Sequence, residues 1–381
     1  MNVYWTCASG EFELHRYPKG QHDKALQAWD SADELAIEHC HTWPDDTQVL
    51  ILNDLFGALS LGLHAFAPTV ITDSEVSKRA IEQNSQVNAV PVPAVLDSLS
   101  PWPKINSIVI KLTKNLGYLE HQLIQIANLD YEVQVVATGK TTLVTSSVLK
   151  LFEQYLSDVH TSLARKKSRL IFARHLGNGK EHTSPYPVRV EWPEKQLTLQ
   201  AHANVFCKDQ LDIGGRFLAD NLPAFEDGQK IVDLGCGNGL LGLCALKQAT
   251  ESKIKIDMRF YDESYMAVES ARLNVTNNFP ESLEQCHFVQ DDCLTSLDSN
   301  SVDLVLCNPP FHQQNTLTEH IAEQMFSDAS RVLTRGGVLY VVANRHLPYQ
   351  KALKKHFGGF KLAAQNSKFV IYSCRKLRNL N

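Results

Sequence analysis

The sequence lacks the features that would place it in a membrane or outside the cell. No apolar run approaches the roughly 18 residues that a membrane-spanning helix needs. The first residues, MNVYWTCASGEFELHRY, have no basic start followed by an apolar core, so we expect no signal peptide. The nine cysteines form no Cys-x-x-Cys pair, which argues against a zinc or disulfide framework. Free thiols are typical of a reducing compartment, and we therefore expect a cytoplasmic protein.

An excess of charge of one sign is also missing. The 42 Asp and Glu residues slightly outnumber the 37 Lys and Arg residues, which gives a net charge of -5. If the protein binds nucleic acid, it must therefore use local basic patches. His39, Cys40 and His41 form a cluster without matching ligands, so we interpret it as structural and expect no metal. The length of 381 residues is sufficient for two or three domains.

Closely spaced glycines follow a short apolar run at residues 230–246, KIVDLGCGNGLLGLCAL. The run IVDL predicts a buried strand, and LLGLCAL predicts an apolar helix. A glycine turn between a strand and a helix is typical of the first unit of a doubly wound nucleotide-binding sheet. Glycine allows positive φ and a close approach of the backbone to a ligand. The turn residues with this expected role are Gly235, Gly237, Asn238 and Gly239.

Acidic residues stand at the ends of three successive predicted strands. Asp233, two residues before the first glycine, could receive the cationic amine of S-adenosylmethionine, whereas dinucleotide sites favour Gly-x-Gly-x-x-Gly. Residues 255–264 predict a second strand ending in Asp262, an acid that could accept both ribose hydroxyls. Residues 287–294 predict a third strand ending in Asp291 and Asp292, which could hydrogen-bond an adenine amine. One such acid is more often a solvated loop residue, but three in order indicate a cofactor site.

The fourth predicted strand, VDLVLC at 302–307, ends in the sequence Asn308-Pro309-Pro310-Phe311. Proline cannot donate to a sheet ladder, so the strand must end there. Two prolines also fix two φ angles, which holds Asn308 rigidly. A lone Pro-Pro is more often only a turn, but after a predicted cofactor site this stiff polar corner indicates a catalytic site. The neighbouring Cys307 is expected to be a core thiol.

The order of these motifs resembles that of class I S-adenosylmethionine-dependent methyltransferases that act on exocyclic amines. Residues 202–223, HANVFCKDQLDIGGRFLADNLP, resemble the segment that precedes the glycine motif in bacterial rRNA guanine-N2 methyltransferases. Over its whole length the chain is similar to the ribosomal RNA large subunit methyltransferase G family. The resemblance implies S-adenosylmethionine as cofactor, 23S rRNA as substrate and the exocyclic N2 of a guanine as methyl acceptor. It adds Phe206, Asp212, Gly214 and Asn308 to the cofactor-binding residues and implies a catalytic role for Asn308, Pro309, Pro310 and Phe311.

The first half of the chain resembles a degenerate copy of the second, with similar strands but altered site residues. Without a gap, residues 51–63 match residues 231–243, with Gly57 at Gly237 and Leu55 and Leu59 at the positions of Gly235 and Gly239. Asp73 and Asn84 match the second predicted strand and its helix, and Leu112-Thr113-Lys114 replace Asn308-Pro309-Pro310. The alternative is a coincidence of two similar αβ patterns.

The duplication predicts an α/β fold with two tandem Rossmann-like methyltransferase domains, the N-terminal one degenerate. We expect the degenerate domain at 1–182, a linker at 177–187 with the glycine, proline and polar content of one, and the catalytic domain at 188–381. Residues 188–200 predict a hairpin that opens the catalytic domain.

The degenerate half carries a dense basic cluster within residues 164–174, ARKKSRLIFAR. Basic side chains release counterions from phosphates and so bind RNA without sequence preference. We expect RNA contacts from Arg165, Lys166, Lys167 and Arg169; the alternative is a solvated helix or strand face.

Three other functions remain open from the motifs. A sister family with the same Asn-Pro-Pro-Phe motif acts on 16S rRNA, and N6-adenine or protein-glutamine methyltransferases usually carry Tyr at the position of Phe311. A non-catalytic RNA-binding assembly protein is the alternative of another class. The sequence does not identify the guanine, the oligomeric state, or whether free rRNA or an assembled particle is the substrate.

Overall fold

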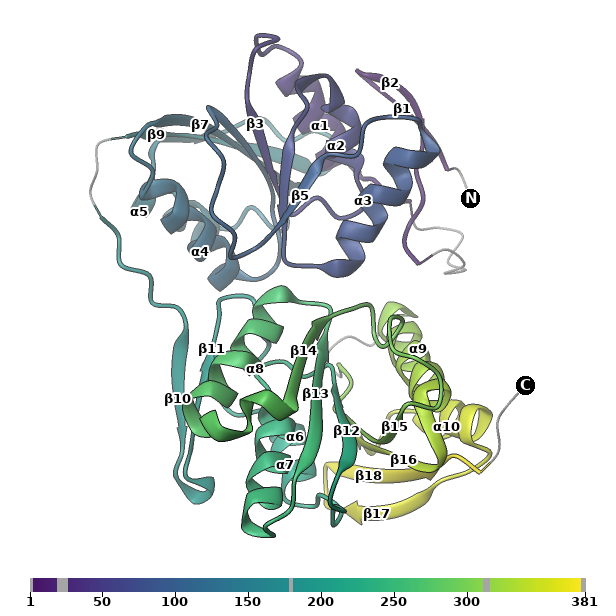
Figure 1. Ribbon diagram of the computed structural model, residues 1–381. Helices are drawn as coiled ribbons and strands as arrows, with labels where there is room; N and C mark the ends of the chain where they lie inside the picture. The colour runs from purple at the N-terminus through teal and green to yellow at the C-terminus, as the bar shows by residue number, and fades with distance from the viewer. Residues whose placement is uncertain (1–2, 19–26, 178–180, 311–315, 378–381) are drawn as a thin grey trace. The chain divides into compact units, whose positions relative to one another are not determined.

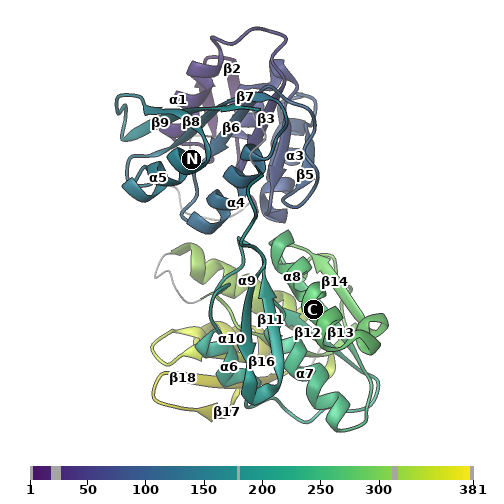
Figure 2. The ribbon, with the colours of Figure 1, turned by 90° about the vertical axis from the view of Figure 1, so that its left-hand side faces the viewer.

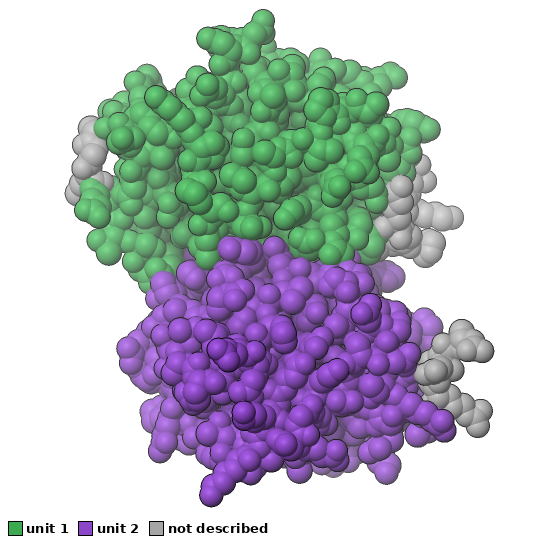
Figure 3. Space-filling view, viewed as in Figure 1, with its two compact units in different colours: residues 1–186 green, residues 187–381 purple. Residues whose placement is uncertain are grey.

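The computed structural model describes residues 3–18, 27–177, 181–310 and 316–377 (Figure 1). The chain separates into two compact units, residues 1–186 and 187–381, which Figure 3 draws in different colours. The strands and helices of each unit can be followed in Figure 1 and, turned by 90°, in Figure 2. Among the described residues, no helix has both the length and the apolar content needed to cross a bilayer.

The second unit is built on a seven-stranded sheet with the strand order β14-β13-β12-β15-β16-β18-β17. Its strands are β12 (Gln229–Leu234), β13 (Ile256–Asp262), β14 (Cys286–Gln290), β15 (Val302–Cys307), β16 (Leu333–Asn344), β17 (Lys361–Gln365) and β18 (Phe369–Arg375). Neighbouring strands from β14 to β16 are parallel, whereas β18 is antiparallel to both β16 and β17. The predicted hairpin is confirmed as β10 (Val188–Trp192) and β11 (Leu197–Ala201).

Helices cover both faces of this sheet, because adjacent strand residues point to opposite sides. Ile231 of β12 packs with α7 (Leu240–Glu251) and α8 (Tyr265–Asn278), whereas Val232 packs with α9 (Thr316–Val332) and α10 (Tyr349–Phe357). A short helix, α6 (Ile213–Ala219), precedes the sheet in the chain. The predicted doubly wound architecture of this half is therefore confirmed.

The first unit has the same strand order, β5-β4-β3-β6-β7-β9-β8, with β9 antiparallel to its neighbours. A hairpin, β1 (Tyr4–Cys7) and β2 (Gly10–Glu13), precedes it. Its strands are β3 (Val49–Leu52), β4 (Thr69–Thr72), β5 (Ala94–Asp97), β6 (Ser107–Lys111), β7 (Glu132–Lys140), β8 (Ser157–Thr161) and β9 (Ser168–Leu176). Its helices are α1 (Ser31–Cys40), α2 (Ala58–Gly62), α3 (Glu75–Val87), α4 (Leu116–Ala127) and α5 (Ser146–Tyr155).

The two units also share individual side-chain contacts. Asn84 of α3 donates through Nδ2 to the carbonyls of Phe56 and His15, and its Oδ1 accepts from the His15 amide. Asn274 of α8 makes the same three bonds, to the carbonyls of Asn238 and Gln200 and from the Gln200 amide. One turn later, Asn88 and Asn278 each bond the amide and carbonyl of one residue in the preceding hairpin segment, Glu13 and Thr198 respectively. Two unrelated αβ patterns would not share this bonding, so the duplication is confirmed.

The structure corrects the predicted match between the two glycine loops by two residues. Gly57 and Gly239 are the N-caps of α2 and α7 in the left-handed conformation, with φ of 89° and 82°. Asn53 and Gly235 are also left-handed, with φ of 68° and 71°. The Asn53 amide donates to the Ile71 carbonyl in β4, and the Gly235 amide donates to the Tyr261 carbonyl at the same position of β13. Leu55 therefore corresponds to Gly237, and Leu59 does not correspond to any glycine of the loop. The ungapped match failed because asparagine, like glycine, tolerates the left-handed region.

The strand register also corrects two of the predicted matches at strand ends. Thr72, not Asp73, corresponds to Asp262: each ends its strand, and each accepts from the amide of the serine that caps the next helix. Lys111, not Leu112, corresponds to Asn308, because Ile110 pairs with Leu52 as Cys307 pairs with Leu234. Sequence letters alone did not reveal these correspondences, which the strand register defines.

The described part of the predicted linker is attached to the first unit. The His182 amide donates to Asn128 Oδ1 at 2.7 Å, and the Tyr186 hydroxyl donates to Glu120 Oε2 at 2.7 Å. These bonds agree with the division of the chain at residue 186.

Candidate functional site

Most of the predicted site residues meet at one edge of the second unit's sheet. In an open α/β sheet, ligands bind outside the carboxyl ends of the strands where the strand order reverses. Here that point lies between β12 and β15. Asp233 is in β12, Asp262 ends β13, Asp291 follows β14, and Asn308 follows β15. Acids therefore lie on one side of the reversal point and the amide of Asn308 lies at it.

The glycine loop after β12 adopts a conformation that suits glycine. Gly235, Gly237 and Gly239 have φ of 71°, 54° and 82°, in the left-handed region. A Cβ added to Gly239 would lie 3.1 Å from the Ala271 Cα, so this glycine also lets α7 pack against α8. A Cβ added to Gly237 would meet no atom of the described residues within 4 Å. Gly237 is thus the loop position with open space for a ligand.

Asp233 is a buried carboxyl group with an unsatisfied oxygen. Its side chain is 1% exposed. Its Oδ2 accepts from the Gly242 amide at 2.9 Å, whereas its Oδ1 has no hydrogen-bond partner among the described residues. Burial raises the pKa of Asp233 to about 8, and the nearby Asp262 adds to the increase while the Gly242 hydrogen bond opposes it. A cation next to this carboxyl group would stabilise its ionised form, so the site favours a cationic partner.

The other acids at this edge have defined local roles. Asp262 accepts from the Gly237 amide at 2.9 Å and from the Ser264 amide at 3.0 Å, and so ties the glycine loop to the start of α8. Asp291 is fully buried, and its two oxygens accept from Thr295 Oγ1 and from the amide and hydroxyl of Ser296. Asp291 therefore anchors the turn after β14.

Asp292 and the segment before α6 complete the predicted cofactor residues. Asp292 is 5% exposed and accepts from Gln324 Nε2 at 2.9 Å. Gly214 is buried in α6, whereas Phe206, in the loop before that helix, is 57% exposed. The cofactor contacts of all these residues stay predictions.

Asn308 is held in one orientation by Asp212, which lies 96 positions earlier in the chain. Asp212 caps α6, and its Oδ2 accepts both the Gly215 amide at 2.6 Å and Asn308 Nδ2 at 2.8 Å. An ionised carboxylate can only accept, so the Asn308 nitrogen must face it. Asn308 Oδ1 is then left as a buried acceptor without a partner among the described residues. A Cβ at Gly215 would lie 3.4 Å from Asn308 Nδ2, so a small residue there leaves room for this pair.

The rest of the predicted catalytic motif is only partly visible. Pro309 is buried and Pro310 is exposed, whereas Phe311 lies outside the described residues. Cys307 is fully buried, and burial raises the pKa of its thiol well above the ordinary value. The expectation of a core thiol is confirmed.

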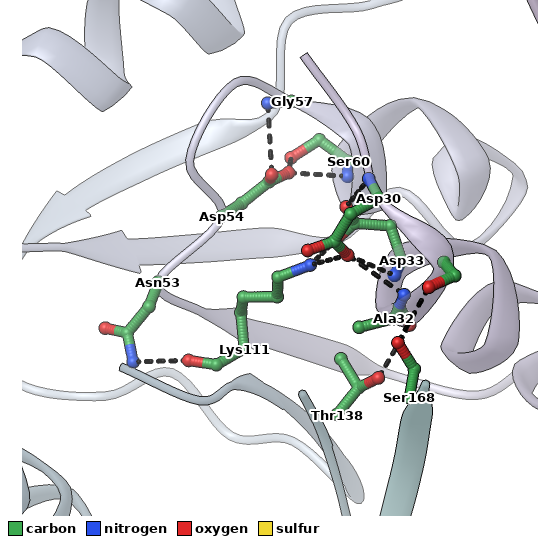
Figure 4. A network of polar contacts seen from close by, with 11 residues as sticks. Asp30, Ala32, Asp33, Asn53, Asp54, Gly57, Ser60, Lys111, Thr138 and Ser168 are labelled. Atoms are coloured by element: carbon green, nitrogen blue, oxygen red, sulfur yellow. Dashed lines mark hydrogen bonds and ion pairs between the residues drawn. The ribbon is translucent and has the colours of Figure 1, made fainter. Parts of the chain in front are cut away.

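The first unit fills the corresponding corner with its own charged side chains (Figure 4). Lys111, at the position of Asn308, donates from Nζ to Asp30 Oδ1 at 2.7 Å and to Asp33 Oδ1 at 2.6 Å. Asp30 caps α1 as Asp212 caps α6, and Asp33 stands where the second unit has Gly215. Asp54 accepts from the amides of Gly57 and Ser60, which closes the loop before α2.

The predicted RNA-binding cluster lies at the turn between β8 and β9 and is partly neutralised. Arg165 Nη1 lies 2.6 Å from Glu38 Oε2, and Lys166 Nζ lies 2.9 Å from Glu34 Oε2. Lys166 and Lys167 have φ of 48° and 61°, as in a tight turn, so these two residues lie on neither a helix nor a strand face, which was the alternative to RNA contact. Arg169 is in β9, paired with Gly139. RNA contact by this cluster stays a prediction. Within the described ranges, no group of His, Cys, Asp and Glu is arranged to hold a metal ion.

The bond between Asp212 and Asn308 is a functional feature that the sequence motifs did not predict. The sequence Asp-Ile-Gly-Gly at 212–215 carries a helix cap followed by two glycines, and the second of these lies against Asn308. Two adjacent glycines in the first turn of a helix are costly for helix stability, which is the local signal that could have indicated a close contact.

Comparison with known proteins places both halves of the chain. A family model described as "RLMG N-terminal domain" matches residues 2–176, and one described as "Methyltransferase small domain" matches residues 196–373. A relative named "Ribosomal RNA large subunit methyltransferase G", from Pseudoalteromonas translucida, is 45% identical over 374 residues, which cover 96% of each chain. A relative of the same name from Aeromonas salmonicida is 44% identical over 384 residues, covering 99% of this chain and 100% of the relative.

A solved structure shares the whole two-unit fold. It is described as "T. Thermophilus 16S rRNA N2 G1207 methyltransferase (RsmC) in complex with AdoMet and Guanosine" and superposes with a TM-score of 0.76. The match covers 98% of this chain and 97% of that one, at 17% identity, so it shows the fold alone. Identity to the named relatives is far higher and extends over nearly their full length. The chain belongs to the ribosomal RNA large subunit methyltransferase G family.

Proposed function

We propose that the protein transfers a methyl group from S-adenosylmethionine to the exocyclic N2 of a guanine in 23S rRNA. Its membership of the large-subunit family supports the substrate class. The observation that carries the chemistry is the buried acceptor Asn308 Oδ1, fixed at the strand-order reversal by the bond between Asn308 Nδ2 and Asp212.

The residues at the edge of the second sheet fit the proposed cofactor. Asp233 Oδ1, buried and without a described partner, suits the cationic amine of the methionine part. Open space at Gly237 allows a ligand to approach the backbone there. When bound, S-adenosylmethionine would supply an electrophilic methyl group, with S-adenosylhomocysteine as the leaving group and one amine proton released to water. The first unit offers no equivalent, because Ile51 stands at the Asp233 position and the ion pairs of Lys111 fill the corner.

Asn308 would act by orienting and stabilising the guanine amine. The N2 lone pair is delocalised into the base, which makes the amine a poor nucleophile. A hydrogen bond from N2–H to Asn308 Oδ1, with a second to the Pro309 carbonyl, turns the lone pair toward the methyl group. Both oxygens also face the nitrogen as it becomes positive during the transfer, and preorganised dipoles of this kind lower the barrier.

Asp212 would strengthen this effect as a positioning residue. Its carboxylate fixes the amide orientation and polarises it, because a donor bond from Nδ2 to an anion increases the negative charge on Oδ1. Asp212 does not need to touch the substrate to do this. Its effect on the reaction passes through Asn308.

The test is to map methylated guanines in rRNA from a strain that lacks the gene, and to restore them with wild-type protein or with Asn308→Ala. We expect loss of one N2-methylguanine in 23S rRNA, restored only by wild type. If a methyl group is lost from 16S rRNA instead, the protein has the substrate of the sister family. Unchanged methylation of both rRNAs, together with failure to bind S-adenosylmethionine, would indicate a non-catalytic RNA-binding protein.

A further inference from the structure

The last 53 residues of the chain contain no acidic side chain. Every one of the 42 Asp and Glu residues lies at or before Asp328, whereas 11 of the 37 Lys and Arg residues lie after it. The net charge of -5 therefore hides a strongly basic segment in a chain whose remainder is strongly acidic. This segment forms β16, α10, β17 and β18, which make up one side of the catalytic unit's sheet.

Some of these cations have structural roles. Arg331 donates to the carbonyls of Leu294 and Leu297, and Lys376 Nζ is bonded to Asn300 Oδ1 and to the carbonyls of Arg331 and Leu333. Most of the others are exposed, and one of them, Lys355, has an acidic partner in Glu323. The exposed cations of the described segment are Arg335, Arg345, Lys351, Lys354, Lys355, Lys361, Lys368 and Arg375.

Three of the exposed cations lie at the catalytic edge of the sheet, and we call them the carboxyl-edge cations: Arg345, Lys351 and Lys368. Arg345 directly follows β16, the parallel neighbour of the strand that carries Asn308. Lys368 directly precedes β18, and its carbonyl accepts from the Arg345 amide at 3.0 Å. Lys351 lies in the first turn of α10, which begins four residues after Arg345. None of the three has an acidic partner within the described residues.

The edge therefore changes sign from one side to the other. Acids lie next to the end of β12, at the end of β13 and just after β14, the amide of Asn308 follows β15, and cations follow β16 and precede β18. Arg345 follows the strand that directly neighbours β15, and Lys368 precedes the next strand; the pairing of Cys307 with Val341 puts Arg345 four residues beyond the partner of Cys307, on the carboxyl side of the sheet. The acidic side suits a cationic cofactor, and the basic side suits an anion attached to the substrate.

We propose that the carboxyl-edge cations bind phosphates of the RNA strand next to the target guanine. This inference rests on the proposed function and adds the RNA-contacting surface of the catalytic unit. Arg and Lys side chains contact phosphates without reading sequence, so their role is to hold the strand in register while Asn308 selects the amine. An anionic lipid surface offers phosphate groups too, but the placement beside Asn308 favours the nucleic acid.

The chain offers a matched control at the opposite edge of the same strands. Arg335 and Arg375 are exposed, belong to β16 and β18, and lie away from Asn308 because Arg375 pairs with Val338 near the start of β16. The double variants Arg345→Gln/Lys368→Gln and Arg335→Gln/Arg375→Gln therefore remove the same charge from the same two strands. Arg345→Lys/Lys368→Arg keeps the charge and checks that the side-chain changes do not disturb folding.

The experiment measures the affinity of the full chain for a labelled single-stranded oligoribonucleotide over a salt series. Neutralising Arg345 and Lys368 should weaken binding several-fold and reduce the log–log salt slope by about 1.4, at about 0.7 per lost phosphate contact. The opposite-edge pair and the charge-conserving pair should retain the wild-type slope, and cofactor affinity by calorimetry should not change. Equal losses in both neutralised pairs, or none in either, would overturn the proposal.

A second arm separates the two sources of phosphate. Vesicles of phosphatidylglycerol and phosphatidylethanolamine replace the RNA, with the same variants. Vesicle binding that depends on Arg345 and Lys368, with an unchanged RNA salt slope, would assign the surface to lipid and overturn the inference. RNA affinity is measured without turnover. The carboxyl-edge cations can therefore prove not to bind RNA while the protein still methylates guanine, and they can bind RNA even if the protein does not methylate it.

Discussion

Lys111 and Asn308 occupy the same position at the ends of equivalent strands, and each is bonded to the aspartate that caps the helix preceding its sheet. In the first unit the bond is an ion pair with Asp30, shared with Asp33, and the corner is closed. In the second unit Gly215 replaces that second acid, and Asn308 keeps a free acceptor oxygen in the described structure. Equivalent contacts thus close the corner in the first unit and hold the proposed catalytic amide in the second.

This difference predicts one cofactor site per chain. Titration of the full protein with S-adenosylmethionine should give a stoichiometry of one by calorimetry. Asp262→Asn should lose at least tenfold in affinity, because it weakens the anchor of the Gly237 loop and the predicted ribose contact. Thr72→Val, at the equivalent strand end of the first unit, is the matched control and should leave affinity unchanged. Two sites per chain would show that the first unit also binds the cofactor.

Turnover should depend on Asn308 far more than cofactor binding does. Asn308→Ala removes the proposed acceptor of the guanine amine, so we expect single-turnover methylation to fall by at least a hundredfold, with cofactor affinity within a few-fold of wild type. Asn308→Asp keeps the shape but places a carboxylate against Asp212, and it should also be nearly inactive. Turnover like that of the wild type in the alanine variant would remove Asn308 from the mechanism.

The positioning role of Asp212 can be separated from its role as a helix cap. Asp212→Ser retains a good N-cap for the Gly215 amide, but its shorter side chain cannot reach Asn308. Asp212→Asn retains an acceptor for both partners and loses the charge. We expect kcat to fall strongly in the serine variant and partly in the asparagine variant, with KM for RNA little changed. If both variants lose only thermal stability, Asp212 is a cap and nothing more.

Local sequence patterns account for part of this site, and contacts between distant residues account for the rest. The strands, the glycine turn and the acids at strand ends were predictable, because hydrophobic runs and glycines act locally. The match of the two halves was displaced because left-handed Asn53 takes the place of Gly235, and letters do not reveal φ. The bond from Asp212 to Asn308 joins residues 96 positions apart, which no local pattern encodes. The sequence shows basic residues near its end, including Arg375, Lys376 and Arg378, but only the strand register shows that Arg345 and Lys368 lie at the edge that carries Asn308.

The raised pKa of Asp233 predicts that stability and cofactor affinity respond oppositely to pH. Its ordinary value is 3.8, and burial raises the pKa in the folded protein to about 8. Between these values the folded chain holds a proton that the unfolded chain has released, so cofactor-free stability should fall as pH rises, by up to about 1.4 kcal/mol per pH unit. Cofactor affinity should instead rise toward pH 8, because binding of the cationic amine needs the carboxylate.

Calorimetry in buffers of different ionisation enthalpy measures the proton directly. At pH 7 we expect close to one proton released per cofactor bound, and none in Asp233→Asn. The same substitution should flatten the dependence of the melting temperature on pH. A wild-type protein that binds the cofactor without releasing a proton would show that Asp233 is already ionised in the free protein.

The basic turn of the first unit allows a test by addition as well as by removal. Glu38 and Glu34 neutralise Arg165 and Lys166 in exposed ion pairs, which contribute little to stability. If this turn contacts RNA phosphates, Glu34→Gln/Glu38→Gln should strengthen RNA binding several-fold at low salt. The log–log salt slope should also become steeper, by about 0.7 for each Arg165 or Lys166 side chain that leaves its ion pair and contacts a phosphate of single-stranded RNA. Neutralising Arg165, Lys166, Lys167 and Arg169 together should have the opposite effect, with cofactor affinity as the control. A slope that responds to neither change, in a chain where the carboxyl-edge cations do alter it, would place the RNA phosphates on the catalytic unit instead of on the degenerate one.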